Sequence, residues 1–200
     1  IDVDTHWGPE MKSTGEVLGI ASTMEEAIYK GLIAAGYKMK KTGGVLFTVR
    51  KTDQFEIPTL ARKFYDMNFK LFATEGTANI IRDFGMEVTV VNKIHENQDN
   101  NLLTLLDSGK IDYVISTSAK GRNPIADSVK MRRHAVERSI PCLTSIDTAN
   151  ALANSLCSKY SEENVELIDI NNLRESKQQI TFAKMESNGN HFLVINTEGK

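Results

Sequence analysis

The segment Lys70 to Asn79, KLFATEGTAN, changes within a few residues from an apolar run to a helix-like pattern. Thr74, Gly76 and Thr77 fall at this change, where a strand would end and a helix would begin. The first N–H groups of a helix have no acceptor within the helix, and the helix dipole is positive at this end. Such groups bind phosphate, and a glycine lets the phosphate approach the backbone. The alternative is a plain helix cap, because threonine also caps helices that bind no ligand.

Two further segments carry groups that suit an anion. Lys93 follows the apolar run EVTVVN, and its ammonium group can neutralise a phosphate as a flexible point charge, although a solvated lysine is the plainer interpretation. The segment ISTSAKGRNP, residues 115–124, places hydroxyls before two cations and a glycine. Hydroxyls, guanidinium groups and backbone amides are the groups that bind a phosphate ester. The residues concerned are Ser116, Thr117, Ser118, Lys120 and Arg122.

Residues suited to acid–base catalysis are fewer. Asp99, in HENQDNN, can serve as a general base, and His95 lies four residues before it. A carboxylate that opens a helix is more often its N-cap, so we favour that role for Asp99. We expect structural or solvated roles for the remaining histidines, which are His6, His134 and His191. We therefore predict no catalytic residue and no metal site in this chain.

Composition limits the remaining function classes. The 200 residues are 40% hydrophobic and 25% charged, which suffices for one well-buried domain with additional segments at its ends. The net charge of -2 does not favour nucleic acid or an anionic membrane as a partner. No apolar run approaches the roughly 20 residues of a membrane span, and the N-terminus lacks a signal-peptide pattern, so we expect a cytoplasmic protein. Cys142 and Cys157 have no metal-ligand spacing, and we expect both to fill the core.

Apolar runs and helical patterns alternate from residue 42 onward. Strands are expected at 43–50, 69–74, 87–92, 112–118 and 141–145, and helices at 52–68, 76–85, 100–109, 126–139 and 147–160. This alternation predicts an α/β fold, a five-stranded parallel Rossmann-like sheet with helices on both faces. Ligands bind at the carboxyl ends of the strands in such sheets. The rule selects the segments around Arg50, Thr74, Lys93, residues 116–122 and residues 144–147.

The ends of the chain follow a different pattern. Residues 22–36 form an expected amphipathic helix, which Ser22 or Thr23 can cap and Gly36 ends. Residues 178–185 and 191–198 flank ESNGN as an expected hairpin. The chain begins with Ile1 and an aperiodic segment, so we expect it to be a piece of a longer protein. We divide it into the end of a preceding domain with a linker helix (1–41), the sheet domain (42–160) and a C-terminal extension (161–200).

Four segments, in order, are similar to one family. GPEMKSTGEVLG, ATEGTAN, VNKIHE and RRHAVERSIPCLTSIDTANAL resemble the carboxyl-terminal region of the large chain of carbamoyl-phosphate synthase over about residues 5–175. The resemblance implies the end of a synthetase domain followed by an allosteric domain of methylglyoxal-synthase-like fold. The parent would be an ATP-dependent ligase that makes carbamoyl phosphate from bicarbonate, glutamine-derived ammonia and ATP for pyrimidine and arginine biosynthesis.

The same resemblance implies ligands and partners. The effector would be a nucleotide, UMP, IMP or phosphoribosyl pyrophosphate. The partners would be the remainder of the large chain and the small glutaminase chain, within an oligomer. No cofactor is expected in this chain, whereas the parent would use ATP with Mg or Mn.

Carried over by position, the family's phosphate pocket falls largely on the residues selected above. It comprises Thr48, Thr74, Gly76, Thr77, Lys93, Thr117 and Ser118, and Arg122 is added as a neighbouring cation. Gln54 stands where some members have a lysine, and Ser116 where they have an asparagine. The Tyr-Asp-Thr of the ornithine site in enterobacterial members is replaced by residues 143–145, Leu-Thr-Ser. We therefore expect a nucleotide effector and not ornithine.

Two other functions stay open. Methylglyoxal synthase shares segments like ATGTTGN and GKIDVLI with this chain, and its catalytic aspartate falls on Asp99. Its two histidines fall on Arg50 and Ile125, and without imidazoles the elimination of phosphate from a triose lacks its electrophilic partners. The third hypothesis is a subunit-interface module with an unused pocket. It predicts an apolar patch around Trp7 and residues 17–20, where a neighbouring subunit would pack.

Overall fold

The computed structural model describes residues 17–21, 23–97, 99–117, 122–157, 180–187 and 190–197. Side chains are described at 23–97, 99–117 and 126–157. The strands are β1 (Val17–Ala21), β2 (Gly44–Thr48), β3 (Lys70–Ala73), β4 (Thr89–Val90), β5 (Tyr113–Ser116), β6 (Cys142–Leu143), β7 (Ile180–Ser187) and β8 (Asn190–Thr197). The helices are α1 (Met24–Ala34), the 3-10 helix η2 (Lys51–Glu56), α2 (Ile57–Asp66), α3 (Glu75–Asp83), α4 (Leu102–Asp107), α5 (Arg122–Glu137) and α6 (Ile146–Cys157).

The predicted five-stranded sheet is confirmed. Its order is β4-β3-β2-β5-β6, and all four strand pairs are parallel. Leu46 in the central strand β2 is paired with Phe72 of β3 and Val114 of β5. The chain moves outward from β2 to β4 and then returns to β5 on the other side of β2. The strand order thus reverses between β2 and β5, which is where sheets of this kind form a crevice.

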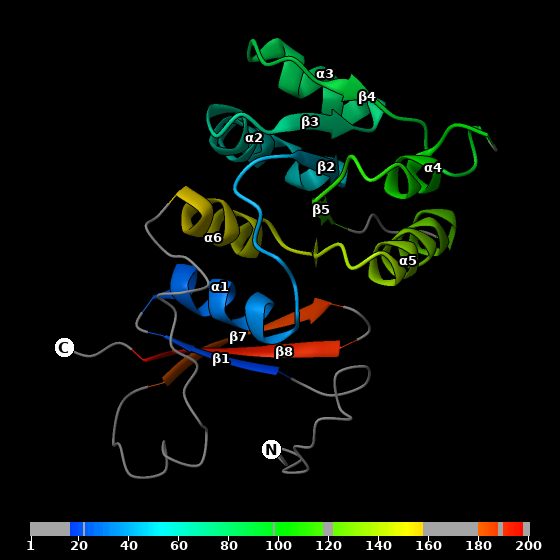
Figure 1. The fold of residues 1–200 in the computed structure, drawn as a ribbon. Coiled ribbons are helices and arrows are strands. Elements are labelled where there is room, and N and C mark those ends of the chain that lie inside the picture. The colour runs from blue at the N-terminus through cyan, green and yellow to red at the C-terminus, as the bar shows by residue number, and fades with distance from the viewer. Residues whose placement is uncertain are drawn as a thin grey trace.

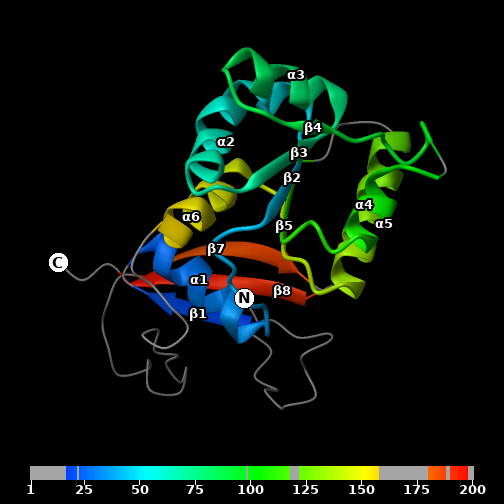
Figure 2. The ribbon, with the colours of Figure 1, turned by 45° about the horizontal axis from the view of Figure 1, so that its top comes forward.

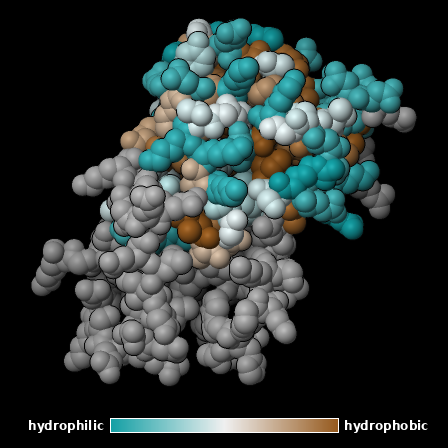
Figure 3. Space-filling model, viewed as in Figure 1, coloured by the Kyte–Doolittle hydropathy of each residue, from teal (hydrophilic) through white to brown (hydrophobic). Residues whose placement is uncertain are grey.

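Alternate residues of the strands pack on opposite faces of this sheet. Val45 and Phe47 belong to a core shared with α1, α2, α3 and α6, whereas Leu46 belongs to a second core with α4 and α5. Because both faces are covered, the strands read as continuous apolar runs in the sequence. In the larger core Phe64 contacts Phe69 edge-on, with ring centroids 5.3 Å apart. Hydrophilic side chains cover much of the visible surface of the surrounding helices (Figure 3).

A second, three-stranded sheet joins the two ends of the chain. Strands β7 and β8 form the predicted antiparallel hairpin, and β8 also pairs in parallel with β1, in the order β1-β8-β7. Helix α1 contacts β1 and β8 of this sheet as well as α6; it lies between the sheet and α6 in Figure 1 and overlaps the sheet in Figure 2. Strand β1 had no counterpart among the predicted elements. The described helices include none long and apolar enough to cross a membrane.

Local sequence signals correctly predicted both ends of α1. Thr23 is the N-cap of α1 and accepts a hydrogen bond from the Glu26 N–H at 3.2 Å. Gly36 follows α1 with a φ of +90°, as a helix-ending glycine does. His134 has a structural role as expected, because its Nε2 lies 2.7 Å from Oδ1 of Asp107.

The prediction for the cysteines is confirmed for one of the two. Cys142 is buried within the second core. Cys157 is exposed, so the prediction that it fills the core is wrong. It is the last residue of α6 and lies one position beyond the buried face that ends at Leu156.

Candidate functional site

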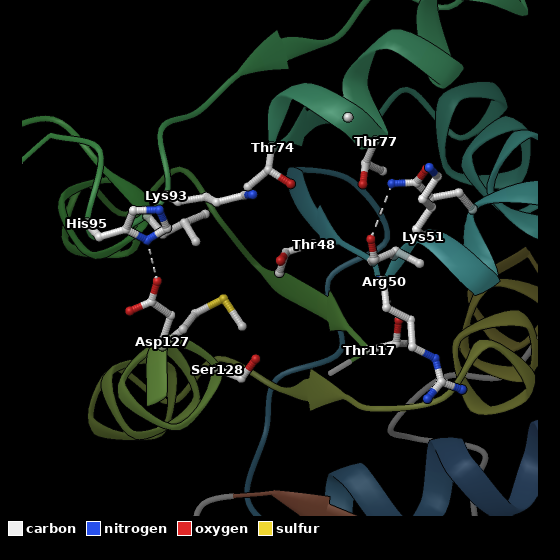
Figure 4. A pocket seen from close by; sticks show the side chains of 15 residues that line it. Thr48, Arg50, Lys51, Thr74, Thr77, Lys93, His95, Thr117, Asp127 and Ser128 are labelled. Atoms are coloured by element: carbon white, nitrogen blue, oxygen red, sulfur yellow. Dashed lines mark hydrogen bonds and ion pairs between the residues drawn. The ribbon is translucent and has the colours of Figure 1, made fainter. Parts of the chain in front are cut away.

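A cavity of about 470 Å³ lies at the carboxyl edge of the five-stranded sheet (Figure 4). This volume falls within the usual range for small-molecule sites. Segments that follow β2, β3, β4 and β5 line it, together with one face of α5. Its lining residues are Thr48, Val49, Arg50, Lys51, Gln54, Thr74, Gly76, Thr77, Lys93, His95, Leu102, Thr117, Asp127, Ser128 and Met131. Four of the five segments selected from the sequence therefore meet here, and the segment at 144–147 does not contribute.

The N-terminus of α3 forms one wall of the cavity. Thr74 is the N-cap of this nine-residue helix, with extended backbone angles. Its carbonyl accepts the first helical hydrogen bond, from the N–H of Ala78 at 2.8 Å. The N–H groups of residues 75–77 therefore have no acceptor within the helix. Thr74 thus occupies the cap position, as the plain-cap alternative expects, but its hydroxyl makes no capping hydrogen bond.

Thr77 carries a buried hydroxyl without a partner. The residue is 1% exposed, and its Oγ1 is the one buried side-chain polar atom without a hydrogen bond among the described residues. The hydroxyl points from α3 into the cavity (Figure 4). Burial without a hydrogen bond costs about 1–3 kcal/mol, so such a group in a native protein calls for a partner, either an ordered water or a ligand.

Gly76 leaves space beside the N-terminus of α3. A Cβ atom at this position would lie 3.4 Å from Nε2 of Gln54, at ordinary contact distance. The Gln54 amide donates a long hydrogen bond, 3.5 Å, to the Val49 carbonyl. The missing side chain therefore preserves the space between α3 and η2 into which an anion can enter.

Cationic side chains surround the α3 terminus. Lys93 is exposed, extends towards Thr74 (Figure 4), and forms no ion pair within the part of the chain that the structure describes. Lys51 lines the cavity from η2. Arg50 also lines it, but its Nε lies 2.6 Å from Oδ2 of Asp53 and its guanidinium is turned away from Thr77 (Figure 4). Among the side chains that the structure describes, Lys93 and Lys51 are thus the cations available to a ligand in this cavity.

The ends of β2 and β5 form the base of the cavity. The Thr117 N–H donates to the Thr48 carbonyl at 3.1 Å, and the Arg50 N–H donates to Oγ1 of Thr117 at 3.0 Å. These bonds hold the two strand ends together and fix the Thr117 oxygen as an acceptor. Its hydroxyl proton remains able to donate to a ligand.

The structure brings six of the eight predicted effector-binding residues into this one cavity. They are Thr48, Thr74, Gly76, Thr77, Lys93 and Thr117. Ser118 lies outside the described residues. Arg122 is the first residue of α5, and its side chain lies outside the described side chains.

A histidine–carboxylate pair on the opposite rim was not predicted. His95 Nδ1 lies 2.8 Å from Oδ2 of Asp127, which joins the segment after β4 to α5. Beside this pair, Leu102 and Met131 give the cavity an apolar area. The sequence placed His95 near a candidate base, but Asp127 is 32 residues away and carries no local signal.

The sequence interpretation of Asp99 requires a correction. The N-cap of α4 is Asn101, whose Oδ1 accepts from the N–H of Leu103 at 2.8 Å and of Thr104 at 3.4 Å. Asp99 precedes the cap by two residues, where its carbonyl accepts from the Thr104 hydroxyl. Its side chain is exposed and does not line the cavity. A turn before the helix places Asn101 at the capping position. The sequence pattern alone did not show which of the two residues would be the N-cap.

Comparison with known proteins shows which family and which solved structure the sheet domain is similar to. Residues 56–144 match the family model described as MGS-like domain. The crystal structure of methylglyoxal synthase from Elizabethkingia anophelis NUHP1 is similar to this chain, with 16% sequence identity and a TM-score of 0.45. The similarity covers 70% of this chain and 94% of that protein.

Proposed function

We propose that this chain is the allosteric, nucleotide-binding region of the large chain of carbamoyl-phosphate synthase. The observation that carries the proposal is the buried, unpartnered hydroxyl of Thr77 at the start of α3, directed into a cavity that Lys93 borders. The ordered set of segments that resemble that enzyme and the MGS-like domain at 56–144 support the same function.

In this proposal the effector's phosphate binds at the start of α3. The amides of residues 75–77 and the hydroxyls of Thr74 and Thr77 donate hydrogen bonds to it, and Lys93 neutralises its charge. The organic part of UMP, IMP or phosphoribosyl pyrophosphate extends towards Leu102 and Met131. Binding shifts the parent between less and more active states through unequal affinity for them, typically worth about 1 to 3 kcal/mol.

The chain's proposed role is regulatory, and catalysis belongs to the parent. The parent would be the ATP-dependent ligase, which uses Mg or Mn and assembles with the small glutaminase chain in an oligomer. This assignment of partners, cofactors and reaction rests on the family resemblance of the quoted segments.

Calorimetric titration tests the proposed binding. The full 200-residue chain is titrated with UMP, IMP and phosphoribosyl pyrophosphate at low ionic strength, where electrostatic attraction is screened least. We expect binding in the micromolar range by at least one ligand, weakened in Thr77→Val and in Lys93→Ala. Lys70→Ala is the matched control, because Lys70 is exposed at the opposite end of β3 from Thr74. Affinity that is unchanged in Lys93→Ala would remove that lysine from the site. The absence of binding heat with every ligand would favour the hypothesis of a subunit-interface module.

A lyase is the second candidate, and the His95–Asp127 pair favours it. A carboxylate that orients an imidazole is a common arrangement for general acid–base catalysis. Asp99, on which the catalytic aspartate of methylglyoxal synthase falls by resemblance, does not line the cavity, so this candidate ranks below the effector site. Incubation with a triose phosphate separates the two. We expect no methylglyoxal, whereas formation of methylglyoxal that is lost in His95→Gln would favour the lyase.

A further inference from the structure

The short helix η2 connects the cavity to helix α2. Two of its six residues, Lys51 and Gln54, line the cavity, and none of the six is buried. η2 continues directly into α2 at Ile57. A 3-10 segment at the start of an α-helix can convert to α-helical hydrogen bonding, which changes the rise and rotation of the chain. η2 is therefore an exposed 3-10 element beside the cavity whose hydrogen bonding a ligand could change.

Two asparagines on α6 connect α2 to the N-terminal helix. Lys63 Nζ, in the last turn of α2, donates to Oδ1 of Asn150 at 3.1 Å. Asn154 donates from Nδ2 to Oε1 of Glu25, in the first turn of α1, at 3.2 Å. Asn150 and Asn154 are four residues apart and so lie on the same face of α6. Polar contacts thus join α2 to α6 and α6 to α1, at two positions one turn apart on α6.

The same three helices share one packed core. Ile28 of α1, Leu60 of α2 and Leu152 of α6 are all fully buried in a single hydrophobic cluster. Next to Glu25, Glu26 forms an ion pair of 2.9 Å with Lys30, a lysine that is only 5% exposed. Closely packed interiors change between discrete arrangements and do not deform continuously. A shift of α2 must therefore be accommodated by α6 and α1.

We propose that occupancy of the cavity is transmitted from η2 through α2 and α6 to α1, with Asn150 and Asn154 as the positioning residues of this relay. The inference rests on the proposed function, because its input is the binding of a ligand in the same cavity. A ligand that contacts Lys51 and displaces Gln54 changes η2, and the two asparagine contacts orient α1 in response. Helix α1 lies in the segment assigned to the junction with the preceding domain, so it is where the signal leaves this domain.

Hydrogen exchange measured on the full chain tests the relay. Exchange is followed with and without the tightest-binding of UMP, IMP and phosphoribosyl pyrophosphate. We expect amides in both η2 and α1 to exchange about fivefold more slowly with ligand, the lower end of usual coupling factors. Asn150→Leu and Asn154→Leu should keep the affinity and the η2 response but lose the α1 response. Arg62→Gln is the control, because it removes an exposed contact of α2 with the Phe84 carbonyl that lies outside the relay.

The outcomes separate the relay from the binding site. If the ligand binds and the exchange of the α1 amides does not change, the relay is wrong and the nucleotide site stands. The same holds if the α1 amides of both asparagine variants respond as strongly as those of the unsubstituted chain. If Arg62→Gln also abolishes the α1 response, general loosening of α2 accounts for the effect and the relay is overturned. If no ligand binds, the proposed function fails, and the relay fails with it.

Discussion

Replacing Thr77 by valine should raise the stability of the domain and lower its affinity for phosphate ligands. The substitution keeps the shape of the side chain and replaces the buried, unpartnered hydroxyl by a methyl group. An unsatisfied buried hydroxyl costs about 1–3 kcal/mol, so its removal should stabilise the ligand-free domain by about 1–2 kcal/mol. For a chain of this size the melting temperature should rise by about 2–8 °C.

The affinity should change in the opposite direction. A hydrogen bond to a charged phosphate contributes about 1.5–3 kcal/mol, so its loss should weaken binding about 10- to 100-fold. Denaturation of the ligand-free protein and calorimetric titration measure the two effects separately. A general disturbance of the fold would lower both quantities, so the opposite signs distinguish a site built for a ligand from ordinary damage.

Thr148→Val is the matched control for this prediction. Thr148 is also the third residue of a helix, but its Oγ1 lies 3.0 Å from the Ser145 carbonyl and 2.8 Å from the Ser145 hydroxyl. Removal of a satisfied hydroxyl should lower stability by about 0.5–1.5 kcal/mol and leave affinity unchanged. If Thr77→Val is destabilised like the control and binds ligand as before, the reasoning about the cavity is refuted.

Three further substitutions test other parts of the account. Gly44→Ala should lower the free energy of unfolding by about 3 kcal/mol in urea titration, because the added Cβ would lie 1.9 Å from the Lys110 carbonyl oxygen; an unaffected midpoint would contradict this close contact. Phe64→Ala should cost about 3–5 kcal/mol by removing a fully buried ring that packs edge-on against Phe69, and a loss below 1 kcal/mol would contradict the packing. Lys93→Ala should reduce the salt dependence of nucleotide affinity, measured between low and physiological ionic strength, and an unchanged dependence would show that its charge does not act on the ligand.

The five-stranded sheet could be predicted because its signals are local. The central strands β2 and β5 are buried on both faces and therefore appear as apolar runs, and helical patterns alternate with the strands along the chain. The position of the cavity followed from a general rule about the carboxyl ends of parallel strands. Thr74, Thr77 and Lys93 were found because they immediately follow strands, so the topology alone brings them to one edge.

The features that were missed depend on contacts between distant residues. Strand β1 pairs in parallel with β8, and the two strands are separated by more than half of the chain, so no local pattern identifies them as neighbours. The His95–Asp127 pair depends on how the segment after β4 folds against α5. The N-cap of α4 depended on the backbone path, which places Asn101 and not Asp99 at the start of the helix. Ser118 and the side chain of Arg122 lie outside what the structure describes and stay predictions.

The most direct test of the central claim is to map a nucleotide onto the backbone amides by ¹⁵N nuclear magnetic resonance. UMP, IMP and phosphoribosyl pyrophosphate are each added to the labelled chain, and the amide shifts are followed residue by residue. The account predicts saturable shifts that are largest at Glu75, Gly76 and Thr77, with a smaller effect at Lys93. Another cavity lies at the amino ends of the strands and is lined by Lys38, Asp112 and Arg138 among others. Shifts that instead cluster around that cavity would contradict the account, as would no shift with any ligand.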